Sequence, residues 1–193
     1  THTRDKVVLF ATNGCFYTLA SNKLPGGGVN GEPVRLMLDL ANDEDVISLM
    51  VHDPERKRVV SASDGRGFVV SEKAVVAQTR AGKQALNVSG DVEAAVCTPV
   101  LGDHLAVVGE NHKILIFPLT DLPEMNRGRG VVLQRYKEGG LSDAKTIAPA
   151  VGLTWRQAGG RTRTELDLTN WMGKRGQTGR LAPKGFAKTH KFR

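Results

Sequence analysis

The sequence predicts an all-β, propeller-like fold built from four to five four-stranded blades around a common axis. A module of strand, tight turn, second strand and glycine-rich loop recurs four times, at a spacing of roughly 46–55 residues. Pairs of valines recur along the chain, and β-branched residues suit a pleated, half-buried surface. A period of this length is typical of blades around an axis. The sequence leaves open whether the ring of blades is closed or open.

The chain of 193 residues is expected to form a single domain, since that length can bury one core. The modules divide it into repeats at approximately residues 1–50, 51–98, 99–145 and 146–181, with a basic tail at 182–193. The tail has little to bury, so we expect it to be loosely held. Helix is expected only as one or two short turns.

Each module predicts a β-hairpin, because its two strands are separated by residues that tolerate a positive φ. Asn-Gly and Asp-Gly pairs are the strongest short signals for such turns. The predicted turns are Asn13-Gly14, Asp64-Gly65, Asn111-His112 and Gly159-Gly160.

Composition excludes a membrane protein and favours the cytoplasm. Hydrophobic residues make up 40% of the chain, and no apolar run approaches the ~18 residues of a spanning helix. Residues 1–6 are polar and no signal-peptide core follows them. Cys15 and Cys97 lie in different strand-like stretches, which predicts two buried free thiols and leaves a disulfide open.

The charge is concentrated in the C-terminal half. Residues 1–110 hold 11 Lys/Arg and 14 Asp/Glu, a net of −3, whereas residues 111–193 hold 16 and 6, a net of +10. A concentrated basic surface indicates a polyanionic partner, with nucleic acid favoured over an anionic membrane. A merely solvated surface would explain the total of +7 but not its clustering.

Catalytic patterns are absent from the sequence. The five histidines are scattered without ligand-like spacing, and neither a P-loop nor a Gly-x-Ser-x-Gly elbow occurs. Tyr136 follows Arg135 in a basic stretch and could either contact a ligand or pack on a strand. We therefore expect no catalytic residue and no metal site in this chain.

Glycine-rich basic loops follow the hairpins of the second, third and fourth modules. One such loop is more often an ordinary turn, but recurrence in three modules favours contacts to phosphates. Such loops read no bases, and aromatic residues are only 5% of the chain, so sequence-independent contact with duplex backbone is favoured over base stacking. The candidate phosphate contacts are Arg66, Arg80, Lys83, Arg127, Arg129, Arg135, Lys174, Arg175 and Arg180.

Three stretches resemble the C-terminal β-pinwheel domain of bacterial type IIA topoisomerase A subunits, and topoisomerase IV (ParC) more closely than gyrase. The stretches are 24–33, 62–69 together with 77–83, and 117–123 running into 127–130. The Phe-Pro-Leu-Thr-Asp-Leu-Pro sequence of the third stretch is rather specific, whereas the individual Gly-Arg loops are not. With the repeat period, the resemblance covers most of the chain.

The resemblance implies a noncatalytic domain that holds duplex DNA along a curved basic rim. It implies that the domain presents the transported DNA segment to the N-terminal cleavage core of the same polypeptide. The ATPase (B) subunit of the holoenzyme is a further implied partner. Mg and ATP are implied for the whole enzyme and no cofactor for this domain, with a cytoplasmic, nucleoid-associated location.

The chain departs from gyrase A at residues 24–31. Gyrase A carries a basic box in its first blade that is needed for tight wrapping, whereas Leu24 to Gly31 contains no Arg or Lys. This departure favours decatenation and relaxation over wrapping, with DNA contacts concentrated on blades two to four and the tail. The alternatives are a gyrase A wrapping domain, a protein-interaction propeller, and an enzyme with a site in a central pore, for which the sequence offers no acid, base or metal cluster.

Overall fold

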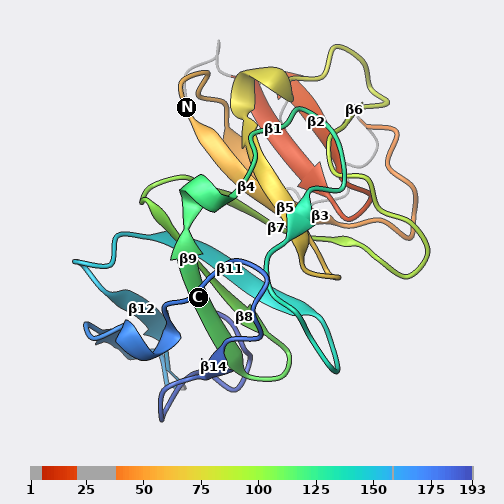
Figure 1. Cartoon of the computed structure of the whole chain (residues 1–193). Coiled ribbons are helices and arrows are strands. Elements are labelled where there is room, and N and C mark those ends of the chain that lie inside the picture. The colour runs from red at the N-terminus through yellow and green to blue at the C-terminus, as the bar shows by residue number, and fades with distance from the viewer. Residues whose placement is uncertain (1–5, 21–37, 158, 193) are drawn as a thin grey trace.

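The computed structural model describes residues 6–20, 38–157 and 159–192. The predicted first-blade loop at 24–31 lies outside these ranges. Three four-stranded antiparallel sheets and one two-stranded sheet follow one another along the described chain (Figure 1). The all-β, propeller-like class is confirmed, and the described sheets do not close into a ring. The fourth sheet has only its hairpin among the described residues, where four strands were expected.

Each four-stranded sheet has the same order, with a hairpin flanked by an inner and an outer strand. The first sheet contains β1 (Lys6–Ala11), β2 (Cys15–Ala20), inner strand β3 (Val46–Val51) and outer strand β6 (Lys83–Gln84). The second contains β4 (Lys57–Ala62), β5 (Arg66–Ser71), inner strand β7 (Ala94–Pro99) and outer strand β10 (Val131–Val132). The third contains β8 (His104–Gly109), β9 (Lys113–Pro118), inner strand β11 (Leu141–Ile147) and outer strand β14 (Arg180–Leu181). The fourth is the hairpin β12 (Leu153–Arg156) and β13 (Thr162–Glu165).

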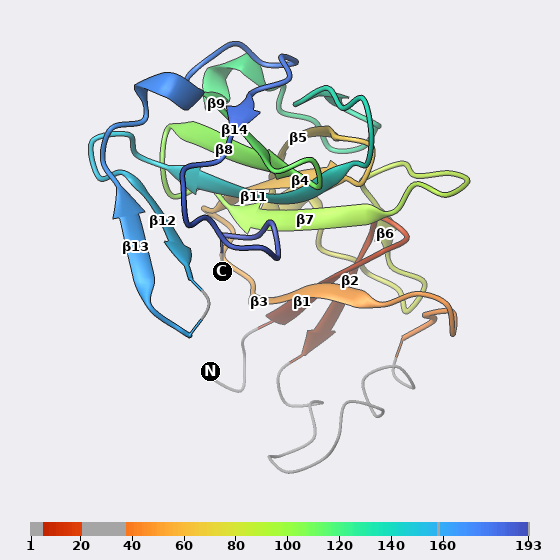
Figure 2. The same ribbon diagram turned by 90° about the horizontal axis from the view of Figure 1, so that it is seen from below.

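The outer strand of every four-stranded sheet comes from the module that follows it. β6 lies beyond the second hairpin but pairs with β2 of the first sheet. β10 pairs in the same way with β5, and β14 pairs with β9. Consecutive sheets are therefore interlocked by the chain itself. The inner strands β11, β7 and β3 lie in succession near the axis (Figure 2).

The hairpin turns lie where they were predicted, and in the first three hairpins the side chain before the positive-φ residue stabilises the turn. Asn13 Oδ1 accepts the Cys15 N–H at 2.9 Å, an Asx turn that recurs in the second and third hairpins. Gly14 and Gly65 have φ of 79° and 85°. His112 takes the same place in the third hairpin with a φ of 65°, which is uncommon for a residue with a Cβ.

The core consists of layers between neighbouring sheets, so both faces of the central hairpins are buried. Val60 packs in the layer between the first and second sheets, while Val59 packs in the layer between the second and third. Successive strand residues point to opposite faces. The recurrent Val-Val pairs are therefore explained by burial on both faces of a sheet.

Three short 3₁₀ helices account for the helix in the described chain: η2 (Glu72–Ala74), η3 (Leu119–Asp121) and η4 (Thr169–Trp171). No helix there is long and apolar enough to cross a membrane. Cys15 and Cys97 are free thiols; both residues are half-buried, and burial of the Cys97 thiol raises its pKa.

The expectation of a loosely held tail is wrong. Phe186 and Phe192 are each only 5% exposed and pack with Trp155 between the third and fourth sheets. The Phe192 N–H also donates to Asp143 Oδ2 at 3.0 Å. Two well-spaced phenylalanines supply enough apolar surface to dock a segment that is otherwise basic and glycine-containing.

A histidine pair fastens the tail to the third hairpin. The backbone carbonyl of His112 accepts the Ala182 N–H at 2.9 Å. Its ring Nδ1 lies 3.0 Å from Nδ1 of His190, so one ring donates only while the other stays neutral. Burial lowers the pKa of His112 from 6.5, and the neighbouring His190 lowers that pKa further.

We predict that acid loosens this contact. As pH falls below about 6.5, the unfolded chain binds a proton at this position before the folded chain does, so the free energy of unfolding decreases. His112→Asn keeps a residue that tolerates positive φ and removes the titrating ring. Urea unfolding midpoints should fall less steeply with acidification in this variant and run parallel to wild type above neutrality. Equal acid slopes would contradict the prediction.

Tyr136 packs between the second and third sheets, and this settles its two alternatives in favour of packing. A Cβ added to Gly65 would lie 2.6 Å from Tyr136 Cε2, and one added to Gly109 would lie 2.6 Å from Cε1. Burial raises the pKa of the Tyr136 phenol, and Asp64 and Glu110 raise it further.

Gly65→Ala is predicted to lower the free energy of unfolding by about 1–3 kcal/mol more than Gly90→Ala. Both glycines have positive φ, but nothing lies within 4 Å of a Cβ at Gly90. The difference therefore measures the close contacts of the added Cβ with the Tyr136 ring and with the Gln134 carbonyl oxygen, which lies 3.0 Å away. Equal losses in chemical denaturation would show that the ring moves aside without cost.

Candidate nucleic-acid interface

The basic loops lie along the outer edges of the sheets and are joined to one another. The Asn87 N–H donates to the Gly128 carbonyl at 2.9 Å, linking the first outer strand to the second loop. The Gly176 N–H donates to the Leu133 carbonyl at 2.8 Å, linking the second outer strand to the third loop. Residues 80–87, 127–135 and 173–181 thus form one continuous edge, which we call the rim.

The structure brings all nine sequence-predicted candidates to the rim or to the strand beside it. Arg66 lies on β5 opposite Val132 of the outer strand β10. Arg66 and Arg175 are half-buried. The exposed candidates are Arg80, Lys83, Arg127, Arg129, Arg135, Lys174 and Arg180.

The candidates differ in how much of their charge is available. Arg66 Nε lies 4.0 Å from Asp64 Oδ2, and Arg175 Nη1 donates to the Val132 carbonyl at 2.7 Å. Arg127 Nε reaches Asn87 Oδ1 at 3.4 Å. Within the described ranges, five of the candidates have neither an acidic partner within 4.0 Å nor a side-chain hydrogen bond: Lys83, Arg129, Arg135, Lys174 and Arg180.

Two glycines of the basic loops lie directly against the sheets, which brings the loop backbone close to the sheet edge. A Cβ at Gly130, where φ is 75°, would collide with the Gly67 carbonyl of β5. A Cβ at Gly82 would lie 2.7 Å from Tyr17 Cε1 on the first sheet. The close approach that glycine permits here is to the protein's own sheet.

A second group of cations is neutralised by carboxylates of the protein itself. Glu72 is only 1% exposed, and its Oε2 accepts a hydrogen bond from Arg58 Nε at 3.0 Å and forms an ion pair with Arg56, whose Nε lies 2.6 Å away. Lys57 Nζ pairs with Glu124 at 2.9 Å. The basic residues at 56–58 therefore form ion pairs within the protein, and none of them is among the candidate phosphate contacts.

Sequence reasoning missed Arg156 on the fourth sheet. With Lys188 it lines a hollow of about 580 Å³, and none of the described residues that line this hollow is acidic. The folded tail forms one wall of the hollow. Because the tail was expected to be loosely held, the sequence did not predict that Arg156 and Lys188 would lie in one hollow. The available signal was the apolar spacing of Phe186 and Phe192 within a basic segment.

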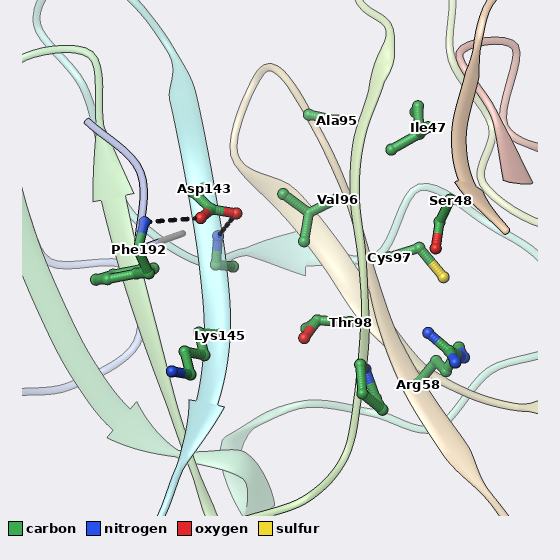
Figure 3. Close-up of a pocket in the computed structure, with 12 residues that line it drawn as sticks. Ile47, Ser48, Arg58, Ala95, Val96, Cys97, Thr98, Asp143, Lys145 and Phe192 are labelled. Atoms are coloured by element: carbon green, nitrogen blue, oxygen red, sulfur yellow. Dashed lines mark hydrogen bonds between the residues drawn. The ribbon is translucent and has the colours of Figure 1, made fainter. Parts of the chain in front are cut away.

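A central hollow of about 290 Å³ lies among the inner strands β3, β7 and β11 (Figure 3). Asp143 and Lys145 of β11 line it, but Lys145 Nζ donates to the Thr154 carbonyl at 3.5 Å. Both Asp143 oxygens already accept backbone N–H groups, from Ala144 at 2.9 Å and Phe192 at 3.0 Å. Desolvation raises the pKa of the Cys97 thiol to about 12, so it stays protonated. Throughout the described residues, no group of three or more His, Cys, Asp or Glu could hold a metal ion.

The interlocked sheets and the basic rim define a propeller-like domain with a continuous cationic edge. The family model described as "DNA gyrase C-terminal domain, beta-propeller" matches residues 5–53, 60–96 and 103–141, and the chain belongs to this family.

Within the family, the chain is similar to the A subunits of DNA topoisomerase 4. The A subunit of that enzyme from Caulobacter vibrioides is 44% identical over 191 residues, covering 99% of this chain and 25% of that protein. Its counterpart from Rickettsia bellii is 38% identical, covering 99% and 26%. The chain thus spans about a quarter of the length of these relatives. The resemblance to topoisomerase IV is confirmed.

Solved structures agree at the level of fold. The Escherichia coli ParC C-terminal domain matches with a TM-score of 0.82 at 22% identity, covering 97% of this chain and 80% of that one. The DNA gyrase A C-terminal domain matches with a TM-score of 0.71 at 14% identity, covering 99% and 64%.

Gly130→Ala is predicted to displace the loop at 127–130 from β5, because the added Cβ collides with backbone. Brief digestion of the native protein with trypsin should then cleave after Arg127 or Arg129 several-fold faster than in wild type. Gly90→Ala is the control, since its Cβ meets nothing within 4 Å. Unchanged cleavage would show that the glycine is not what holds the loop.

Proposed function

We propose that this chain is a noncatalytic domain of a type IIA DNA topoisomerase that binds duplex DNA without sequence preference. The observation that carries the proposal is the continuous rim, on which three successive modules place cations that lack acidic partners among the described residues. A duplex presents a regular row of phosphates that such a row of cations can follow.

Sequence independence follows from the kind of contact that the rim offers. Its cations stand on loops and short strands, and the described part of the rim has no helix or long ribbon to enter the major groove. Contacts to phosphates position a protein on DNA but carry no direct sequence information. Affinity should therefore depend strongly on salt and weakly on base composition.

The 44% identity to the A subunit of a topoisomerase IV supports a role in handling the transported DNA segment during decatenation and relaxation. On this proposal the chain works in the nucleoid, beside the cleavage core of its own polypeptide and with the ATPase subunit of the holoenzyme. The domain itself would use no cofactor, and Mg and ATP would act elsewhere in the enzyme.

A gyrase-type wrapping domain is the second candidate, because the family model and the gyrase A structure match the same fold. The absence of Arg and Lys at 24–31 favours the first candidate. The two are separated by the linking number of relaxed circular DNA closed by ligase in the presence of the protein. A signed change that grows with protein concentration would favour wrapping.

Arg129→Gln is predicted to weaken duplex binding about equally for different sequences and to lower the log–log salt slope by about one. The matched control is Lys145→Gln, which removes one positive charge from the inner edge of the third sheet. The measurement is fluorescence anisotropy of a labelled linear duplex of arbitrary sequence, titrated from low to physiological salt.

A loss of equal size in both variants would mean that net charge matters and the rim does not. If the wild-type chain failed to bind any duplex even at low salt, the proposed function would fall.

A further inference from the structure

One part of the rim is hollowed and contains an aromatic ring. A depression of about 500 Å³ lies beside the outer strand β14 of the third sheet. Its apolar wall is formed by Leu115, Trp171 and Met172, and Arg135 and Arg180 stand in its lining. The segment from Gly176 to Gly179 completes the enclosure. We call this depression the Trp171 hollow.

Trp171 is peculiar to the third loop. Met172 bridges Ile116 of β9 just as Glu124 bridges Val69 of β5, so Trp171 corresponds in position to Pro123 of the second loop. The indole Nε1 donates to the Leu181 carbonyl at 2.9 Å, which fixes the ring beside β14. The ring is half-buried, so it packs on the core and still lines the hollow.

The charge of the Trp171 hollow is positive and unopposed. Arg135 and Arg180 have no acidic partner within the described ranges, and no Asp or Glu belongs to the lining there. Lys174 and Arg175 of the same loop add to the local potential. Guanidinium groups that line one hollow without a carboxylate favour an anion there, and their planar fork suits a phosphate.

The loop around the hollow is fixed by hydrogen bonds within the protein that need no ligand. The Arg135 N–H donates to the Gln177 carbonyl at 3.1 Å, and the Gln177 N–H donates to the Lys174 carbonyl at 3.2 Å. Gln134 Nε2 donates to the Thr178 carbonyl at 3.0 Å. A loop ordered in advance loses little entropy when a ligand binds.

The other two hollows lack this combination. In the hollow that contains Arg156 and Lys188, the aromatic residue is Phe186, which is only 5% exposed because it packs against Trp155 and Phe192. The central hollow contains the carboxylate of Asp143. Of these three hollows, only the Trp171 hollow joins a half-buried aromatic ring to arginines without acidic partners among the described residues.

We propose that the Trp171 hollow binds one unpaired nucleotide of DNA, with its base stacked on Trp171 and its phosphate held by Arg135 and Arg180. The proposal rests on the proposed DNA-binding function and extends it from duplex backbone to locally unpaired strands. Stacking on an aromatic ring tolerates every base, because each base has a π-face. The site therefore recognises the unpaired state of DNA without reading its sequence.

The test uses the two tryptophans of the chain. Trp155 is only 1% exposed, so an oligothymidylate of about ten nucleotides should quench the fluorescence of Trp171 selectively. Trp171→Leu should weaken binding of this single strand about tenfold and change duplex affinity less than twofold. Trp171→Phe, which keeps a stacking surface, should retain most of the single-strand affinity.

The control is Leu166→Ala, which removes an exposed apolar side chain outside the rim and should change neither affinity. Duplex binding without quenching by the single strand at low salt would overturn this proposal and leave the proposed function standing. Equal losses for both DNA forms in Trp171→Leu would also overturn it, whereas loss of all DNA binding in wild type would remove the proposed function itself. If Trp171→Leu unfolds, wild-type quenching and Trp171→Phe decide the question.

Discussion

The fold and the rim both depend on the exchange of outer strands between modules. β2, β5 and β9 would each present an unpaired edge if the downstream segment did not cover it. Open edges are a liability in β-proteins because their N–H and C=O groups recruit other chains. Covering each edge with the next module satisfies these groups, and it also draws three separate loops into one line. The basic surface is thus a consequence of how the sheets are completed.

The need to cover each sheet edge with a loop also explains where glycines and cations occur in these loops. A loop that runs against a sheet edge needs positions without a Cβ, and Gly82 and Gly130 supply them. Most of the basic side chains of these loops are exposed, although Arg175 is half-buried and bonds to the Val132 carbonyl. Cations elsewhere are used differently, since Arg56 and Arg58 neutralise the buried Glu72 between neighbouring segments. A buried carboxylate is tolerated only when it is paired and hydrogen-bonded. Counting basic residues along the chain therefore overstates the charge available to a ligand.

The C-terminal third of the chain departs most from the regular module. Its sheet is a hairpin in the described residues, and the space beside that hairpin is filled by the docked tail through Phe186 and Phe192. Docking gives the tail's cations defined positions, as Lys188 beside Arg156 shows. On the third sheet, the longer loop that leads to β14 leaves room for the Trp171 hollow. The regular repeats thus supply a continuous cationic edge, and the irregular end supplies its local features.

The sequence by itself determined the fold class, the hairpins and the candidate cations, because these depend on local signals. Asn13-Gly14 and Asp64-Gly65 specify turns through side-chain acceptors and positive φ, and the Val-Val pairs report strands buried on both faces. Tertiary structure alone decided that β6, β10 and β14 belong to the preceding sheets, because two-residue strands carry no periodicity. It also decided that Arg175 bonds to a carbonyl while Arg135 stands free of the described carboxylates, since partners distant in sequence set the availability of a charge. The docked tail escaped prediction for the same reason, because its apolar partners lie on other segments of the chain.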